Sequence, residues 1–170
     1  MKRLVHFPKT RLSEAVKEFG GLGRDDAIQG AQERLESMRG EADQAICDGI
    51  SALEAIADTP HEKTAYSPGQ MNQMLAHCDQ TVTLAGTFGY KGLDDAARCL
   101  CDLLDGLQEA DIRDVPSVAV HVRAMRLLAP GSPPLPATHQ DVVLTELAKI
   151  LTHHGIVRAA DTVEKTGPLG

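Results

Sequence analysis

The stretch DDAIQGAQERLESMRGEADQAICDGISALEAIAD, residues 25–58, decides the fold because its apolar residues recur at alternating spacings of three and four. That period is typical of an amphipathic α-helix, and Asp25 and Asp26 suit its start because negative charge stabilises a helix N-terminus. A helix of over 30 residues would be roughly 50 Å long, which is more than one small bundle buries. We therefore expect it either to extend beyond the core or to pack against a second copy in a dimer. The residues of this predicted seam are Ile28, Ala31, Leu35, Met38, Ala42, Ala45, Gly49, Ala52 and Ile56.

The rest of the chain predicts further helices, separated by segments rich in Pro and Gly. Ser67 followed by Pro68 is typical of a helix start, and this helix should end near the turn at 86–89. No segment alternates with period two, so we expect an all-α protein. Its fold should be an antiparallel bundle with a four-helix core, a long N-terminal helix and an extra C-terminal helix. The later helices are predicted over residues 93–107, 114–129 and 139–154.

Breaker residues divide the chain into three predicted parts. Residues 1–23 end in GGLG and should form an N-terminal extension with a short helix over 12–19. Residues 24–157 should form the bundle, and residues 158–170 a flexible tail. A single core is expected, because 170 residues is the ordinary length of one domain.

Composition and charge disfavour several classes of protein. Aromatic residues make up only 3% and charged residues 24%, which argues against an all-β fold and against wholesale disorder. The formal net charge is −7 and no stretch is strongly basic, so we expect no nucleic-acid partner. No apolar run reaches the roughly 18 residues of a membrane span, and the first residues lack the apolar core of a signal peptide. The four Cys fall within predicted helices, so we expect reduced thiols and a cytoplasmic protein.

The segment MLAHCDQTVTLAGTFGYKGLDDAARCLCDLLDGL, residues 74–107, contains two short motifs, TFGY at 87–90 and CLCDLL at 99–104. Both motifs resemble the central helical hairpin of histidine-containing phosphotransfer (HPt) domains, most closely an α-proteobacterial type. The similarity extends over residues 24–154 and includes AVHVRAMRLL at 119–128. It implies a four-helix bundle that passes a phosphoryl group between a histidine kinase and the receiver domain of a response regulator. In such domains an exposed His accepts the phosphoryl group, a Lys three residues later balances its charge, and a Gly four residues later lets the receiver approach.

The three functional positions of that family hold other residues in this chain. Counted back from TFGY without a gap, Asp79 stands in place of the His, Val82 in place of the Lys and Thr83 in place of the Gly. Together with Thr87 these positions form the predicted binding face. The resemblance therefore implies a degenerate HPt-like module that binds a histidine kinase or a receiver domain without phosphoryl transfer.

His77 is the alternative phosphoryl acceptor. It lies two residues before Asp79, which places the two side chains about 200° apart on a helix. A surface or boundary His without chemistry is the other interpretation. Three functions stay open at this point: a docking module, an active phosphotransferase that uses His77, and a structural protein that dimerises through the long helix.

Several other conspicuous side chains are predicted to serve packing. Cys99 and Cys101 are also about 200° apart on a helix, so they cannot bind one zinc ion together, and we expect no metal or other cofactor. His121 should pack or hydrogen-bond between helices. Phe88 should close the end of the bundle as a buried ring.

Overall fold

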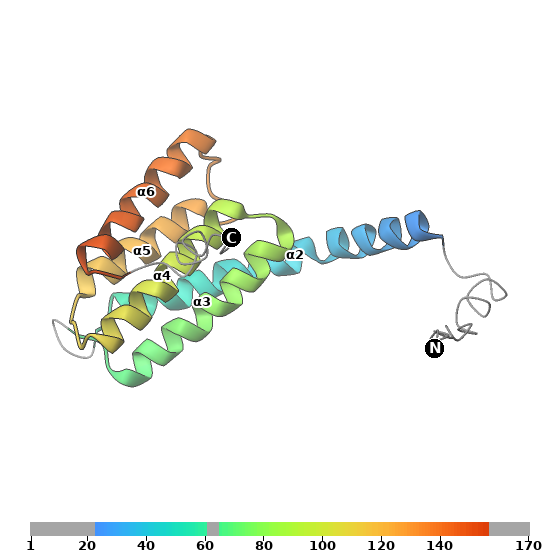
Figure 1. Ribbon diagram of the computed structural model, residues 1–170. Coiled ribbons are helices and arrows are strands. Elements are labelled where there is room, and N and C mark those ends of the chain that lie inside the picture. The colour runs from blue at the N-terminus through green and yellow to red at the C-terminus, as the bar shows by residue number, and fades with distance from the viewer. Residues whose placement is uncertain (1–22, 61–64, 157–170) are drawn as a thin grey trace, which may run out of the picture. The chain divides into compact units, whose positions relative to one another are not determined.

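The computed structural model describes residues 23–60 and 65–156, which form five α-helices (Figure 1). No strand occurs within these two ranges, and the predicted all-α fold is confirmed. The helix expected over 12–19 and the tail expected over 158–170 lie outside the described residues. In chain order the helices are α2 (Arg24–Ala57), α3 (Pro68–Phe88), α4 (Lys91–Glu109), α5 (Val115–Leu128) and α6 (Ala137–His153).

The chain forms two compact units, and the boundary between them falls after Met38, inside the 34-residue helix α2. In the first unit the described residues, 23–38, are exposed apart from the half-buried Gly30. The second unit contains the rest of α2 and helices α3 to α6, and it holds the buried core. The described residues of the first unit are therefore exposed to solvent, whereas the second unit contains the buried core, and helix α2 contributes residues to both units.

The part of α2 in the second unit buries a stripe that differs from the predicted seam. Ala45, Ala52 and Ile56 were expected in the core but are only half-buried, so that part of the prediction is wrong. Ala42 and Gly49 of the predicted seam are buried. The rest of the buried stripe lies one residue after predicted seam positions, at Ile46, Ile50, Leu53 and Ala57. A strict heptad seam falls behind by about 20° per heptad around a straight α-helix, so a shift in this direction agrees with the 3.6-residue turn.

Local sequence explains how α3 begins and ends. The Ser67 hydroxyl accepts a hydrogen bond from the Gln70 N–H at 3.2 Å, and the Gln70 side chain accepts one from the Ser67 N–H at 2.9 Å. This capping box, with Pro68 in the first turn, confirms the predicted start. Gly89 ends the helix with φ 81°, a left-handed conformation that glycine adopts without strain. The helix reaches Phe88 and so extends through most of the turn that was predicted at 86–89.

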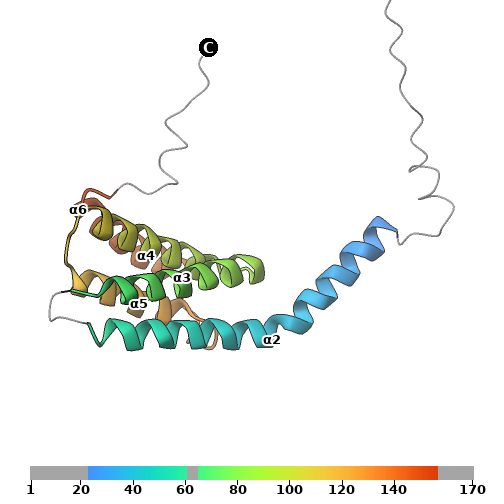
Figure 2. The same cartoon turned by 90° about the horizontal axis from the view of Figure 1, so that it is seen from below.

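Helix α4 lies at the centre of the second unit, where it contacts α3, α5 and α6. The short turn at Gly89 and Tyr90 makes α3 and α4 an antiparallel hairpin, and Figure 2 shows the two helices side by side. Burying a Leu side chain stabilises a fold by about 1.5–3 kcal/mol, so α4 supplies much of the hydrophobic stabilisation. Its buried residues are Leu93, Ala96, Ala97, Cys99, Leu100, Leu103, Leu104 and Leu107.

A polar cluster joins α2 to α5 at the edge of the core. The Arg126 guanidinium donates to both carboxylate oxygens of Glu54, at 2.9 and 2.6 Å, and to the Ser51 hydroxyl at 2.8 Å. The hydrogen bond from Arg126 holds the pKa of Glu54 below its ordinary value. A bidentate pair of this kind fixes geometry as well as adding stability, so it sets how α2 lies against α5.

Candidate functional site

The candidate site is the exposed face of α3. Asp79, Thr83 and Thr87 follow one another at intervals of four residues and are all exposed, so they share one face of the helix. Val82 is half-buried and packs against the core, and His77 is also half-buried. The structure therefore brings three of the four predicted binding-face residues onto an open surface, while Val82 borders it.

Hydrogen bonds within α3 engage the hydroxyls of this face. The Thr83 hydroxyl donates to the Asp79 carbonyl at 2.9 Å, and the Thr87 hydroxyl donates to the Thr83 carbonyl at 2.8 Å. Because each hydroxyl proton is directed into the helix, the threonines present methyl groups and hydroxyl lone pairs outward. The Asp79 carboxylate is the one ionised group among these three side chains.

Cys101 of α4 borders the site from the neighbouring helix. Its thiol lies 3.9 Å from the Asp79 carboxylate, within reach of a weak S–H hydrogen bond. The interaction of the buried Cys78 thiol with Cys101, together with burial, raises the pKa of Cys78. The contact between Cys101 and Asp79 was not predicted from the sequence. The hairpin register could have revealed it, since Cys101 follows Tyr90 by as many residues as Asp79 precedes it.

The charges of α4 near this face are mostly negative. Arg98 stands one turn before Cys101, and its guanidinium is paired with Asp94 at 3.0 Å. Asp102 and Asp105 follow in the next turn, half-buried and exposed respectively. A partner that covers this face of α3 and α4 therefore meets several carboxylates and one arginine that is already paired.

The TFGY turn is held against the first turn of α2 in the second unit. The Arg39 guanidinium donates to the Phe88 carbonyl at 3.1 Å and lies 5.7 Å from the centre of the Phe88 ring. The Tyr90 hydroxyl donates to the Asp43 carboxylate at 2.5 Å. Burial and the hydrogen bond to Asp43 raise the pKa of Tyr90. These contacts fix the end of α3 relative to α2 and so hold Thr87 in place.

Phe88 is not the core anchor that was predicted. Its ring is half-buried and lies outside the hydrophobic cluster of the second unit. As the last residue of α3, Phe88 reaches the Arg39 guanidinium, so its ring serves a cation–π contact at the surface. The prediction of a buried ring rested on the rarity of Phe in this chain and on its place at the turn. The local sequence around Phe88 does not indicate that Arg39 of α2 lies beside it.

His121 forms a hydrogen-bonded link between two helices, as predicted. Its imidazole is fully buried, with Nδ1 at 2.8 Å from the Ser117 carbonyl and Nε2 at 3.5 Å from the Cys99 sulfur. Burial lowers the pKa of His121, which favours the neutral ring. In that form Nδ1 donates to the carbonyl and Nε2 accepts from the thiol of α4. The pair is enclosed in the core, so it serves packing.

The remaining cysteines and histidines form no metal centre in the described part of the chain. Cys99 is buried and Cys101 faces the α3 surface, so the two thiols diverge. His154 is paired with Asp114 at 2.8 Å. Over residues 23–60 and 65–156, no three His, Cys, Asp or Glu side chains gather as they would around a metal ion.

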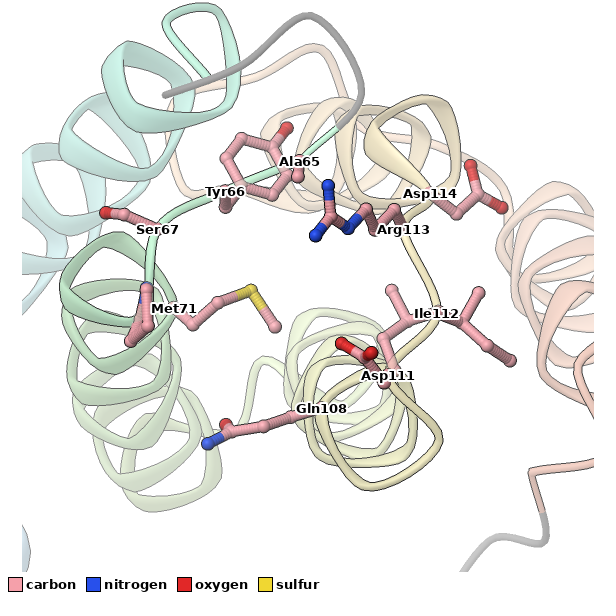
Figure 3. Close-up of a pocket in the computed structure, with 11 residues that line it drawn as sticks. Ala65, Tyr66, Ser67, Met71, Gln108, Asp111, Ile112, Arg113 and Asp114 are labelled. Atoms are coloured by element: carbon pink, nitrogen blue, oxygen red, sulfur yellow. The ribbon is translucent and has the colours of Figure 1, made fainter.

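A cavity of about 310 Å³ opens where α3 begins and α4 ends (Figure 3). Tyr66 and Met71 line one side of it and Ile112 another, while Gln108 and Arg113 supply polar groups. This cavity was not predicted from the sequence, because it depends on how the segment before α3 meets the loop after α4. Its mixed lining favours no particular chemistry.

Tyr66 owes its position at this cavity to a hydrogen bond. Its hydroxyl donates to the Ala57 carbonyl at the end of α2, at 3.0 Å. Burial, with the negative charges of Asp58 and Asp114, raises the pKa of Tyr66 to about 12. The phenol therefore stays protonated and keeps this bond throughout the neutral range.

No protein-family model matches the chain, and searches of curated proteins and of solved structures found no similar protein. The resemblance to HPt domains therefore rests on sequence alone, chiefly on TFGY at the turn between α3 and α4 and on CLCDLL in α4, and it remains a prediction. Across the described helices, none combines the length and the apolar character that crossing a bilayer requires.

Proposed function

We propose that the exposed face formed by Asp79, Thr83 and Thr87 is a docking surface for a two-component signalling partner. The partner would be a histidine kinase or a receiver domain, and binding would occur without phosphoryl transfer through this protein. The observation that carries the proposal is the open face of α3 in a helical bundle. On this face, Asp79 occupies the position at which the resemblance to HPt domains places the phosphoryl-accepting His.

The chemistry of that face supports docking over transfer. Asp79 has a carboxylate where HPt domains have an imidazole, and the negative charge of that carboxylate would repel an incoming phosphoryl group. Val82 replaces the lysine that would balance the charge, and the nearby Arg98 is already paired with Asp94. An aspartyl phosphate would also need a bound divalent cation, for which the described residues offer no cluster of ligands. Binding itself needs only a complementary surface.

Four free cysteines fit this role in a reducing compartment. The two-component partners implied by the resemblance would meet the protein in the cytoplasm, and we extend the proposal to that location.

A combined binding and mass-spectrometry experiment tests the proposal. The full chain is titrated with receiver domains and with kinase dimerisation domains by calorimetry, and is separately incubated with phosphoramidate or a phosphorylated receiver. We expect measurable binding to at least one domain and no gain in mass of one phosphoryl group. Binding to none of them would contradict the docking surface.

His77 provides the control for the phosphoryl arm of this experiment. Its half-buried ring lies on the other side of Cys78 from Asp79. An acid-labile phosphoryl adduct that disappears in His77→Ala would show that the protein is an active phosphotransferase, and the proposal of binding without transfer would then be wrong.

A further inference from the structure

The first unit of the protein exposes a row of large apolar side chains on α2. Ile28, Leu35 and Met38 are 46, 43 and 54% exposed, and Ala31 is exposed on the same line. We call these four residues the N-terminal stripe. Single apolar residues are common on protein surfaces, but a continuous row along one helix face marks an interaction site.

The spacing of the N-terminal stripe specifies the kind of partner. The steps from Ile28 to Ala31, Leu35 and Met38 are three, four and three residues, which is the pattern of alternating a and d positions in a coiled coil. A second amphipathic helix fits such a row by placing its own side chains between these. An identical helix is present at equal concentration in every solution of the protein, which makes a second copy the simplest partner.

We propose that the N-terminal stripe binds the N-terminal stripe of a second copy as an antiparallel helix pair centred on Glu33. In this arrangement Ile28 lies opposite Met38 of the second copy, and Ala31 lies opposite Leu35 of the second copy. The two-fold axis generates the same contacts in reverse, so every member of the stripe is covered.

The sizes of the side chains favour the antiparallel arrangement. It pairs the small Ala31 with the large Leu35, so neighbouring layers have similar volume. A parallel pair in register would instead place Ala31 against Ala31 and Leu35 against Leu35. That would leave a narrow layer beside a wide one, and uneven layers pack poorly because helices keep a nearly constant separation.

The charges beside the stripe favour the same arrangement. With Ile28 as an a position, Asp25 and Arg39 occupy e positions and Arg34 occupies a g position. A parallel pair would set Arg34 against Arg39 of the second copy twice, which is repulsive. The antiparallel pair sets Asp25 of each copy against Arg39 of the other, in addition to the contacts that Arg39 makes with Phe88 and Tyr90 in its own chain, and it leaves a single contact between the two Arg34 side chains. Opposite charges therefore outnumber like charges in the antiparallel dimer only.

Sedimentation equilibrium on the full chain tests the dimer. A seam of about two heptads is short, so we expect a concentration-dependent equilibrium between monomer and dimer. Met38→Glu should raise the dissociation constant at least about tenfold, because it buries a charge in the seam. Leu127→Glu is the matched control, since Leu127 on α5 is 55% exposed against 54% for Met38, and it should leave the dissociation constant within about twofold.

Two results would overturn the dimer. The first is a monomeric mass for the wild-type chain up to about 1 mM, the weakest association that would still count as a complex. A monomeric mass is also what we would observe if residues 1–22 of the same chain bound the N-terminal stripe, and in that case too the proposed dimer would be wrong. The second is an equal effect of Met38→Glu and Leu127→Glu, which would place the contact elsewhere.

Disulfide trapping tests the orientation independently of affinity. Chains carrying Ala31→Cys are mixed with chains carrying Leu35→Cys, oxidised mildly, and analysed by peptide mass spectrometry, which separates the new links from any at the native cysteines. We expect links between position 31 of one copy and position 35 of the other. Links of 31 to 31 and 35 to 35 would establish a parallel pair and contradict the antiparallel proposal.

Discussion

The two parts of helix α2 share one spacing pattern and differ completely in burial. Ile28 and Leu35, in the first unit, are nearly half exposed, whereas Ile46, Ile50 and Leu53, in the second unit, have no exposed surface. Three-four spacing therefore shows that a segment is an amphipathic helix, and it does not show what covers the apolar face. In the second part the cover is the bundle of the same chain, and in the first part we propose that it is a second copy.

Truncating a leucine in each part should give the largest contrast. Leu53→Ala should lower the free energy of unfolding by about 2–5 kcal/mol, because it opens a cavity in a closely packed core. Leu35→Ala should change it by about 0.5 kcal/mol or less in dilute solution, where the monomer dominates. Urea denaturation at micromolar concentration measures both. Equal losses would mean that Leu35 is covered within its own chain.

Phe88 tests where the core of the second unit ends. Its ring is half-buried against Arg39, so we expect Phe88→Ala to cost about 1–2 kcal/mol, well below the 3–5 kcal/mol of a fully buried Phe. Thermal unfolding of the variant beside the wild type gives the value. A loss of about 4 kcal/mol would restore Phe88 as a core anchor.

One arginine from each unit should distinguish a charge held by contacts between helices from a solvated charge. Arg126→Ala removes the paired contacts to Glu54 and Ser51 and should cost about 1 kcal/mol, since both members of the pair are about one-third exposed. Arg34→Ala, in the first part of α2, should cost less than about 0.5 kcal/mol in the monomer. Indistinguishable losses in urea denaturation would show that the Arg126 pair contributes no more than an ordinary surface charge.

Acid should weaken the second unit through two carboxylates. The hydrogen bond from Arg126 lowers the pKa of Glu54. Burial raises the pKa of Asp114, but its hydrogen bonds to Ser117 and His154 outweigh this and lower it. Because both values are lower in the folded state than in the unfolded chain, the stability they supply is complete above the unfolded-state pKa. It is lost as the pH falls through the folded-state pKa, so unfolding should become easier below about pH 5.

Glu54→Gln provides the control for this pH dependence. The amide cannot ionise, so the variant should be less stable than the wild type at pH 7 and should lose less stability between pH 6 and 3. A variant whose melting temperature falls as steeply as that of the wild type over this range would show that Glu54 does not contribute to the acid sensitivity.

Sequence predicted those features of the fold that depend on neighbouring residues. Helix α3 follows from the Ser67–Pro68 start and the Gly89 end, since capping chemistry acts over a few residues. The long helix was expected to end at Asp58, and α2 ends at Ala57. Contacts between distant segments were harder to predict. The shift of the buried stripe in α2 depends on where α3 and α5 lie, and the contact of Phe88 with Arg39 joins residues far apart in sequence.

The candidate site shows the same division. The resemblance to HPt domains placed Asp79, Val82, Thr83 and Thr87 on one predicted binding face. In the structure Asp79, Thr83 and Thr87 share an exposed face because they are four residues apart, which is a local property of a helix, and Val82 borders it. The thiol of Cys101 reaches that face only because the α3–α4 turn sets the register of the hairpin. The cavity beside Tyr66 depends on two loops that meet from different helices, and nothing in the sequence of either loop indicates the other.

The most direct test of the docking face compares two threonines that differ only in their place. Thr83 on α3 and Thr145 on α6 are both exposed, and each hydroxyl donates to the carbonyl of an aspartate four residues earlier, at 2.9 and 2.7 Å. Calorimetric titration of the signalling domain that binds the wild type should show that Thr83→Arg weakens binding at least about tenfold, by bulk and charge, while Thr145→Arg changes it less than about twofold. Equal affinities for Thr83→Arg and Thr145→Arg would place the contact elsewhere and contradict a docking surface on the exposed face of α3.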